Sequence, residues 1–532
     1  MTRGFLLLPV ACSFIVFIGA AQPTYTGISG FWDYQTNYRT PQYIRRCPNS
    51  SVIHAIMMVA DDSLNPNLSR RTAYAFSSNN GITWTTFNQI RVPARRSGYP
   101  SLDIGQGTIG CAPIIANHNI ITGTSLESTV FVDFPAGGGA FAEIAPPSSM
   151  GSDEPGFPEV AGAADGSIVL VASRFAAGSL HVTRTDDFLS WQPWGTLTLD
   201  FVSDGFVAET NTTSRVGVVV NTPEGPLSWY ESTNNGNTWP ATPAQLLPGM
   251  IPAGSDTFVT QQGLDLVYLN GDTLVTFGVT KLIGGNPTER DQGIGFYSRS
   301  TGFVLAAPHS SILGVTDTLR KHQTNQHTVG YPAIGLLGPF IVIAFQAFMP
   351  ETSAAGFNYS DVFTTFSLDG RNWSHPLNAT HTLSLDERYP SMSKWNTGGA
   401  AVVFQEDPQP GSAVFGDNSP LARVRQKFIL VLPPDAVNEY PRELPDEFTL
   451  FQNYPNPFNP TTAISYQLTA NSFVSLRVFD VLGREIATLV NEQKPPGTYS
   501  VLFDARSLTS GVYFYRLVAG GFVQTRKLLL MR

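Results

Sequence analysis

The sequence predicts an all-β fold, namely a six- or seven-bladed β-propeller followed by a small Ig-like β-sandwich. Gly (48 residues) and Pro (39 residues) are abundant, which favours many turns over long helices. Turn motifs recur through residues 22–435, as expected when one supersecondary unit is repeated. The 532-residue chain is also too long for one ordinary core, so we expect the repeat array and the C-terminal segment to fold separately.

The composition excludes several classes of protein. Hydrophobic residues make up 42% of the chain and aromatic residues 11%, which excludes a disordered chain. Charged residues make up only 14%, against roughly 25% in an average soluble protein. The net charge of −9 argues against a nucleic-acid partner, because such a partner requires a basic face. We therefore expect a soluble, turn-rich β protein that binds no nucleic acid.

Residues 1–21 are predicted to be a secretory signal peptide. Arg3 precedes an apolar run from Phe5 to Ala20 that ends in small residues, which is the pattern of such peptides. The run is shorter than the ~20 residues that a membrane helix needs. No later segment qualifies, so we expect no integral membrane segment after signal removal. An uncleaved anchor is the alternative interpretation.

Signal removal leaves two cysteines, Cys47 and Cys111. An exported protein with an even number of cysteines can hold a disulfide, because the surroundings are oxidising. Two unpaired thiols in neighbouring strands are an equally good interpretation of the sequence. Neither cysteine lies in a recognisable nucleophile motif.

One turn motif recurs along the chain. SSNNGITW begins at Ser77, STNNGNTW begins at Ser232, a shorter SLDGRNW begins at Ser367, and a degraded copy begins at Thr185. In such a turn Ser and Asn or Asp bond the backbone, Gly takes a positive φ, and Trp packs between adjacent sheets. The residues predicted to build these turns are Ser77, Asn79, Gly81, Thr83, Trp84, Ser232, Asn234, Gly236, Thr238, Trp239, Ser367, Asp369, Gly370 and Trp373.

A second motif is an aromatic–Pro pair that precedes an apolar strand. It occurs at Tyr99, Phe157, Tyr331 and Tyr389, and the first two copies are 58 residues apart, as are the last two. A period of this size accommodates the four short strands of one propeller blade. Weaker copies near Pro41, Phe206 and Phe258 bring the number of units to seven.

The Ser–Asn–Gly–Trp turns resemble the Asp-box (bacterial neuraminidase, BNR) repeats of sialidase-like β-propellers, over most of residues 40–430. The resemblance implies that these turns connect the third and fourth strands of a blade and are structural. Because sialidases have six blades, the resemblance favours six, whereas the repeats favour seven. Photosystem-assembly-type and sortilin-like scaffolds, which are built on similar repeats, are a further alternative.

Ligands of propellers bind where the chain enters each inner strand and where the second and third strands connect. Charged residues gather in these segments, although the chain is poor in charge; solvated loop tips are the alternative explanation. The candidate catalytic carboxylates are Asp61, Asp62, Asp153, Glu154 and Asp204. The candidate substrate-binding residues are Arg46, Arg96, Arg388, Asp386 and Glu387.

The sialidase resemblance implies a Tyr–Glu nucleophile, an Asp acid/base and three arginines that hold a substrate carboxylate. Arginine suits the last role because its planar fork bonds a carboxylate bidentately. Arg46-Cys47-Pro48 resembles the Arg-x-Pro near the sialidase N-terminus, with Arg96 and Arg388 as its partners. However, Arg45 replaces the aromatic residue of that motif, Arg70-Arg71 lies where the Asp would follow, and no Tyr–Glu pair can be assigned. A glycoside hydrolase and a non-catalytic propeller that binds a protein or polysaccharide therefore both remain open.

No cofactor and no metal site are predicted. The sequence lacks the HExxH, GxSxG, P-loop and dinucleotide motifs. Loops rich in Asp and Asn could hold Ca²⁺, but no EF-hand-like spacing supports it.

After a linker at 436–448, residues 449–532 are predicted to form the small β-sandwich. Short alternating strands follow a Pro/Asn-rich run (FQNYPNPFNPTT), with glycines between them. This run, together with VFDVLGREIATLV, SGVYFYRL and the closing Thr525-Arg526-Lys527, resembles the type A C-terminal sorting domain of type IX secretion. The resemblance implies export to the cell surface or the medium by that machinery. We therefore expect two partners, the type IX machinery and a glycan or surface polysaccharide.

Overall fold

The structure is a computed structural model of an almost entirely β protein. It describes residues 22–36, 39–120, 126–147, 155–174, 179–198, 205–221, 224–321, 327–382, 384–417, 419–433, 448–453, 456–468, 472–494, 497–506 and 508–531. The chain divides into two compact units, Met1–Glu439 and Tyr440–Arg532. The predicted signal peptide and most of the predicted linker lie outside the described residues, so their boundaries stay predictions.

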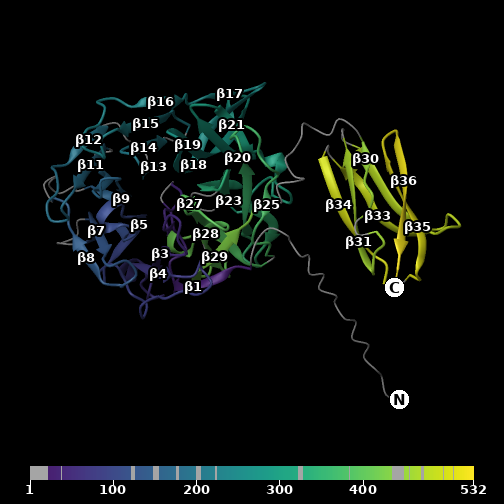
Figure 1. The fold of residues 1–532 in the computed structure, drawn as a ribbon, viewed down its shortest axis with the longest axis horizontal. Helices are drawn as coiled ribbons and strands as arrows, with labels where there is room; N and C mark the ends of the chain where they lie inside the picture. Colours follow the sequence, from purple (N-terminus) through teal and green to yellow (C-terminus); the bar gives the residue numbers. More distant parts are fainter. Residues whose placement is uncertain are drawn as a thin grey trace, which may run out of the picture. The chain divides into compact units, whose positions relative to one another are not determined.

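The described strands of the first unit form seven sheets, which follow one another in chain order around a ring (Figure 1). We call them blades 1–7, and within each blade the inner strand comes first in the lists below. Blades 1–3 comprise β2 (Ile44–Arg46), β3 (Ile53–Ala60) and β4 (Arg70–Ser77); β5 (Ser97–Ile104), β6 (Pro113–Ile120), β7 (Leu126–Asp133) and β8 (Phe141–Ile144); and β9 (Gly156–Gly162), β10 (Ile168–Arg174), β11 (Ser179–Thr185) and β12 (Gly195–Thr198).

Blades 4–7 continue the ring, and the predicted propeller is confirmed with seven sheets among the described residues. Blades 4 and 5 comprise β13 (Phe206–Thr210), β14 (Val216–Asn221), β15 (Leu227–Ser232) and β16 (Ala244–Leu247); and β18 (Asp256–Leu269), β19 (Asp272–Ile283), β20 (Asn286–Ser298) and β21 (Gly302–Ala307), with β17 (Ile251–Ala253) beside β18. Blades 6 and 7 comprise β22 (Val329–Leu337), β23 (Phe340–Thr352), β24 (Asn358–Ser367) and β25 (Leu377–Asn378), with β27 (Trp395–Asn396) beside β22; and β26 (Asp386–Met392), β28 (Ala400–Asp407), β29 (Val424–Val431) and β1 (Thr24–Gly30).

The two ends of the propeller sequence meet in blade 7. Strand β1 lies antiparallel to β29, so that Thr24 faces Phe428 and Gly30 faces Val424. The first strand of the unit is therefore the outer strand of its last blade. Short helical turns, α1 (Pro66–Ser69), η1 (Gly107–Ile109), η2 (His309–Ser311) and η3 (Ala413–Phe415), lie in the connections.

The antiparallel strands give the ring two faces. We call the face where the chain enters each inner strand the leading face. The opposite face, which carries the connections from first to second and from third to fourth strands, is called the turn face. The repeated Ser–Asn–Gly–Trp turns follow β4, β15 and β24, which are third strands, so they lie on the turn face.

These turns share one hydrogen-bond pattern. Ser77 Oγ accepts from Gly81 N at 2.9 Å, and Trp84 Nε1 donates to Gly81 O at 3.1 Å. The turns beginning at Ser232 and Ser367 repeat both bonds, at 2.9 Å each for the first and at 3.1 and 3.2 Å for the second. As predicted, the indole packs between blades, since Trp84 contacts Phe428 edge-on with ring centroids 5.2 Å apart.

The aromatic–Pro motif forms a bulge at the start of four inner strands. Tyr99, Phe157, Tyr331 and Tyr389 take positive φ angles of 46–57°, which bulky residues rarely adopt. The strand register shifts at the same place, for example between Gly98 and Ser101. These four rings form one buried cluster with Trp32 and Tyr34.

That cluster surrounds the segment between β1 and β2, whose described residues fill the centre of the ring. Thr40 Oγ1 donates to Pro332 O of blade 6 at 2.6 Å. Arg39 donates to Tyr99 O of blade 2 and to Phe157 O of blade 3, at 3.3 Å each. Because inner strands of well-separated blades hold one segment, the chain itself fills the channel toward the leading face.

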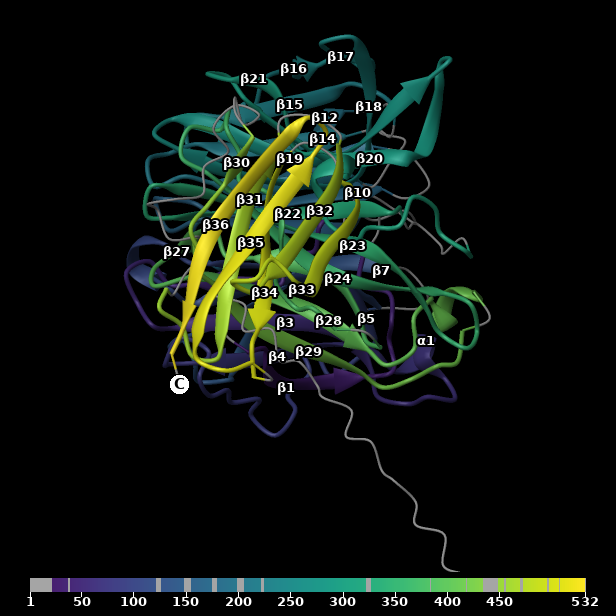
Figure 2. The same ribbon diagram turned by 90° about the vertical axis from the view of Figure 1, so that its right-hand side faces the viewer.

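The C-terminal unit is a β-sandwich, in agreement with the prediction. One sheet contains β30 (Thr449–Leu450), β31 (Thr461–Leu468) and β34 (Gly497–Asp504); the other contains β33 (Glu485–Lys494), β32 (Ser472–Phe479), β35 (Gly511–Ala519) and β36 (Phe522–Leu530), which Figure 2 shows side by side. Side chains from both sheets, such as Tyr466 and Leu476, share one core. Tyr515 Oη donates to Phe451 O at 2.6 Å and so holds the Pro/Asn-rich run against the sandwich.

Candidate functional site

Three predicted substrate-binding residues, Asp386, Glu387 and Arg388, lie at the start of β26 and are all buried. Arg388 Nε lies 2.8 Å from Asp386 Oδ2, and Arg388 Nη2 donates to Gly411 O at 2.9 Å. Burial raises the pKa of Glu387 to about 9, so this carboxyl is protonated at neutral pH. The group is engaged within the protein and presents no open surface to a substrate.

The other predicted residues of the leading face are more exposed. Asp61 forms an ion pair with Arg91 at 2.7 Å, and Asp62 accepts from Leu64 N at 2.8 Å in a surface turn. The backbone N–H of Leu64 also lowers the pKa of Asp62. Arg96 is half-buried before β5. The remaining carboxylate candidates, Asp153, Glu154 and Asp204, lie outside the described residues.

Arg46 lies far from Arg388 along the channel. Tyr43 N donates to Ser391 Oγ and Arg46 N to Ser393 Oγ, both at 2.8 Å, so β2 runs beside β26 in the same direction. Arg388 is at the leading end of β26, and Arg46 is at the turn-face end of β2. The structure therefore does not bring Arg46, Arg96 and Arg388 together as one carboxylate clamp.

A column of buried charges fills the channel between these two ends. Arg39 pairs with Glu159 at 3.0 Å near the leading face. Farther along, Gln42 donates to Asp265 Oδ1 at 2.9 Å, and Lys394 pairs with the same carboxylate. Ion pairing offsets the cost of removing these charges from water.

The column ends at a cavity on the turn face that we call the axial pocket, with a volume of about 350 Å³. Four connections between first and second strands, from blades 1, 2, 4 and 7, contribute its walls. It is lined by Arg45, Arg46, Pro48, Asp103, Ile104, Gly105, Gln106, Gly110, Cys111, Glu209, Thr210, Asn211, Thr212, Ser393, Lys394 and Trp395.

Arg45 joins two carboxylates of the axial pocket. Arg45 Nε lies 3.0 Å from Asp103 Oδ1, and Arg45 Nη2 lies 3.3 Å from Glu209 Oε2. Burial raises the pKa of Glu209 to about 8, although Arg45 counteracts this shift. Two carboxyl groups thus stand beside one cation, an arrangement that can bind hydroxyl groups.

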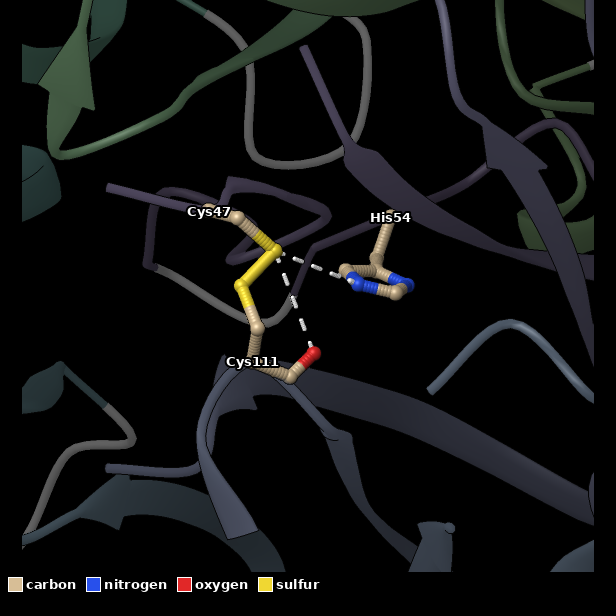
Figure 3. A group of neighbouring side chains, drawn as sticks. All are labelled: Cys47, His54 and Cys111. Atoms are coloured by element: carbon tan, nitrogen blue, oxygen red, sulfur yellow. Dashed lines mark hydrogen bonds between the residues drawn. A yellow bond between two sulfur atoms is a disulfide. The ribbon is translucent and has the colours of Figure 1, made fainter. Parts of the chain in front are cut away.

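Cys111, which lines the axial pocket, forms a disulfide with Cys47 (Figure 3). It connects the turn-face loops of blades 1 and 2, and its Cα atoms are 5.5 Å apart. His54 Nε2 lies 3.7 Å from Cys47 Sγ, while its Nδ1 lies 2.8 Å from Tyr74 Oη. The three side chains are grouped like metal ligands, but bonded sulfurs provide no thiolate. This resolves the choice that the sequence left open between a disulfide and free thiols.

No sequence motif pointed to Arg45, Asp103, Glu209 or Lys394 as site residues. A usable signal exists, because charged residues are rare in this chain and these lie in or directly after inner strands. Because successive side chains of a strand alternate between its two sides, Asp103 lies on the same side of β5 as Ser101, which donates to the buried Glu159. What the sequence does not show is which blades place their charges opposite one another.

The fold and its site define an all-β propeller protein with a sandwich-type C-terminal domain. Residues 452–531 match the family described as "Secretion system C-terminal sorting domain". The C-terminal unit is therefore a type IX sorting domain, and the protein is exported to the cell surface or secreted. No helix among the described residues is long and apolar enough to cross a membrane.

Solved structures are similar to this chain at low sequence identity. Polysaccharide lyase Uly1 is 9% identical, with a TM-score of 0.42 over 77% of this chain and 94% of that one. An α-L-arabinanase of Penicillium chrysogenum is 12% identical (TM-score 0.37, over 77% and 98%). A sialidase of Trypanosoma rangeli is 9% identical (TM-score 0.37, over 96% and 87%). No curated protein matches the chain, and similarity at this level assigns no activity.

Proposed function

We propose that this exported propeller recognises glycans through the axial pocket. The observation that carries the proposal is the combination of a cavity of about 350 Å³, charged hydrogen-bonding groups and the half-buried Trp395 on its wall. Ligand pockets in proteins start at roughly 300 Å³ and place a few polar groups in a concave site. The axial pocket has this size, which suits one or two sugar units.

Each part of the pocket matches a feature of a sugar. Asp103 and Glu209 supply oxygens for hydroxyl groups, and Lys394 and the guanidinium of Arg45 supply donors. Trp395 supplies an aromatic face for the apolar side of a sugar ring. The leading face supports the proposal less well. Arg388 is fully buried in ion pairs with Asp386 and Asp407, and the described residues between β1 and β2 fill the channel there.

A second candidate function is glycoside hydrolysis in the same pocket. The pKa of about 8 for Glu209 favours it, because a carboxyl that stays protonated at neutral pH can act as a general acid. Asp103, on the other side of Arg45, would then be the second carboxylate. This alternative differs from the predicted sialidase arrangement in both its residues and its face of the propeller.

A glycan array tests the proposal. The mature protein without its sorting domain is applied to neutral and acidic glycans, and bound glycans are then incubated with it to detect cleavage. We expect retention that is lost in the Trp395→Ala variant and kept in Trp239→Ala, because Trp239 is half-buried like Trp395 but does not line the pocket. Retention of no glycan would contradict the proposal, and cleavage that is lost in Glu209→Gln would establish the enzyme instead.

A further inference from the structure

Lys394 and Asp265 form an ion pair that is buried on both sides. Each side chain is only 1% exposed, and Lys394 Nζ contacts Asp265 Oδ1. Asp265 lies in β18, the inner strand of blade 5, and Lys394 follows β26, the inner strand of blade 7. The pair therefore connects two blades that are not neighbours in the ring, across 129 residues of sequence.

This position suits an ammonium group poorly. An ammonium group has three N–H donors, whereas Asp265 is the one hydrogen-bond acceptor of Lys394 Nζ among the residues that the structure describes. A buried charge with unmet donors is costly. Burial accordingly lowers the pKa of Lys394, which favours the neutral amine. A neutral amine is a nucleophile, and an ammonium group is not.

The carboxyl group of Asp265 is held so that its carbon can be attacked. Asp265 Oδ2 accepts from Ile334 N at 2.8 Å, and Oδ1 accepts from Gln42 Nε2 at 2.9 Å. Such donors stabilise the negative charge that develops on oxygen when a nucleophile adds to the carbon. Because Lys394 Nζ already contacts Oδ1, the nitrogen and the carbon that would react are neighbours in the folded protein.

Glu209 supplies a carboxyl group that can move protons beside this pair. Arg45 Nη2 lies 3.3 Å from Glu209 Oε2 and donates to Gln42 Oε1 at 3.0 Å, so Arg45 and Gln42 connect Glu209 to Asp265. The charges of Lys394 and Asp265 both act on the pKa of Glu209. Burial raises that pKa to about 8, so the carboxyl is protonated at neutral pH and can act as a general acid.

We propose that Lys394 and Asp265 are joined in the folded protein by an amide (isopeptide) bond that forms without another enzyme. Lys394 Nζ bonds to Asp265 Cγ, and the bond from Cγ to Oδ1 breaks. The oxygen leaves as water with two of the three protons that the ion pair carries on nitrogen. Glu209 passes these protons from nitrogen to oxygen and ends unchanged.

The reaction needs no other reactant and has a route for its product. The axial pocket is lined by both Lys394 and Glu209, so the water can leave through it. The amide carries no charge, which removes the cost of burying two ions. This inference is independent of glycan recognition, because the amide keeps one N–H donor at Lys394 and its test measures mass.

Tryptic digestion of the purified full chain tests the bond. Trypsin cleaves after unmodified lysine and arginine but not after a lysine whose side chain is an amide. We expect residues 216–281, which contain Asp265, to be recovered joined to residues 389–423, which contain Lys394. The expected mass is the sum of the two peptides less one water, and fragmentation in the mass spectrometer locates the bond.

Lys281 and Asp256 provide a control within the same digest. They are 3.0 Å apart, but their side chains are 29% and 39% exposed, so both ions remain in contact with water. Cleavage after Lys281 is expected to proceed normally. The comparison shows whether burial, and not contact alone, leads to the bond.

Two variants examine the chemistry. Lys394→Arg keeps a positive charge but removes the nucleophile, and we expect its two peptides to be recovered separately. Glu209→Gln cannot pass protons, and we expect bond formation in freshly purified protein to slow about a hundredfold or more. Melting temperatures of both variants show whether they are folded.

The wild-type digest decides the proposal even if a variant fails to fold. Recovery of residues 216–281 and 389–394 as separate, unmodified peptides from the wild type overturns it. A loss of water that fragmentation maps to other residues also overturns it. A bond that forms equally fast in a folded Glu209→Gln variant overturns the role of Glu209 alone.

Discussion

Arg388 Nε lies 2.8 Å from Asp386 Oδ2, and both side chains are fully buried. The same guanidinium also lies 3.8 Å from Asp407 Oδ2, which is buried as well. A cation with two buried acidic neighbours holds the start of β26 in place, and removing it leaves both carboxyl groups without a counter-charge.

We therefore expect Arg388→Ala to lower the free energy of unfolding by about 3–5 kcal/mol, because it leaves buried charge uncompensated. Urea denaturation of the propeller unit measures this loss. Arg425→Ala on strand β29 of the same blade is the control, since its pair with Glu406 is exposed on the arginine side and such pairs contribute about 0–1 kcal/mol. Equal losses in the two variants would show that Arg388 is not a buried structural cation.

The buried carboxyl of Glu387 should make the free energy of unfolding depend on pH. Burial raises the pKa of Glu387 from its ordinary value of 4.5 to about 9, so the folded protein holds a proton that the unfolded chain releases. Its contribution to stability is complete below pH 4.5 and is lost as the pH rises toward 9. We expect the unfolding free energy to fall over this window, by at most about 1.4 kcal/mol per pH unit for this group.

The Glu387→Gln variant isolates that contribution, because Gln resembles the protonated carboxyl and does not titrate. Urea midpoints at a series of pH values are expected to fall less steeply in the variant than in the wild type. Asp480→Asn in the sorting domain is the control, since Asp480 lies on the surface of the other unit. Parallel slopes for the wild type and Glu387→Gln would contradict a buried neutral carboxyl.

The disulfide between Cys47 and Cys111 predicts a loss of stability on reduction. The two cysteines are 64 residues apart in sequence. A disulfide restricts the unfolded chain, so losing it lowers the free energy of unfolding by about 2–4 kcal/mol. A Cys47→Ser, Cys111→Ser double variant is expected to unfold at lower urea concentration than the oxidised wild type. A reductant is expected to shift the wild type toward the double variant and to leave the double variant itself unchanged.

The Gly81→Ala variant tests how tightly the first repeated turn packs against Phe428 of blade 7. Gly81 has a φ of +80°, and a Cβ atom at this position would lie 2.0 Å from the ring of Phe428. Gly81→Ala is therefore expected to cost the strain of a left-handed residue, about 1–2 kcal/mol, and a further 1–3 kcal/mol, roughly, from overpacking.

Gly271 provides the matched control for this prediction. It has a φ of +81°, but a Cβ atom there meets nothing within 4 Å. Gly271→Ala should therefore show the strain alone, and thermal unfolding of both variants compares the two costs. A loss in Gly81→Ala no larger than that in Gly271→Ala would mean that the turn does not pack as the structure has it.

The repeated turns were predictable from sequence because their hydrogen bonds are local. Ser77, Gly81 and Trp84 bond within eight consecutive residues, so the motif itself contains the geometry. The partner of Trp84 was not predictable, because Phe428 belongs to a blade at the other end of the chain. The number of blades was ambiguous because the resemblance favoured six and the repeats favoured seven. The role of β1 was not predictable either, since it completes blade 7 from the far end of the sequence.

The candidate site was predicted less well than the fold. The sequence identified Arg46 as an arginine for a substrate carboxylate, and that role stays a prediction, with Arg46 on the opposite face from Arg388. Arg45 was treated as a departure from a known motif, yet it joins Asp103 and Glu209 at the floor of the pocket. Residues 31–36 and 39–43 gave no sign in the sequence that they would fill the channel, because the contacts of Arg39 and Thr40 reach blades 2, 3 and 6.

The sequence by itself determined the all-β class, the repeated blade and the exported destination, because turn residues, strand periodicity and the sorting motifs are local patterns. Only the tertiary structure decided which charged side chains share the channel. Side chains alternate between the two faces of a strand, so a shift of one residue reverses which of them point inward. The aromatic–Pro bulges introduce such shifts at Tyr99 and Tyr389, and the ring then brings the inward charges of distant blades together.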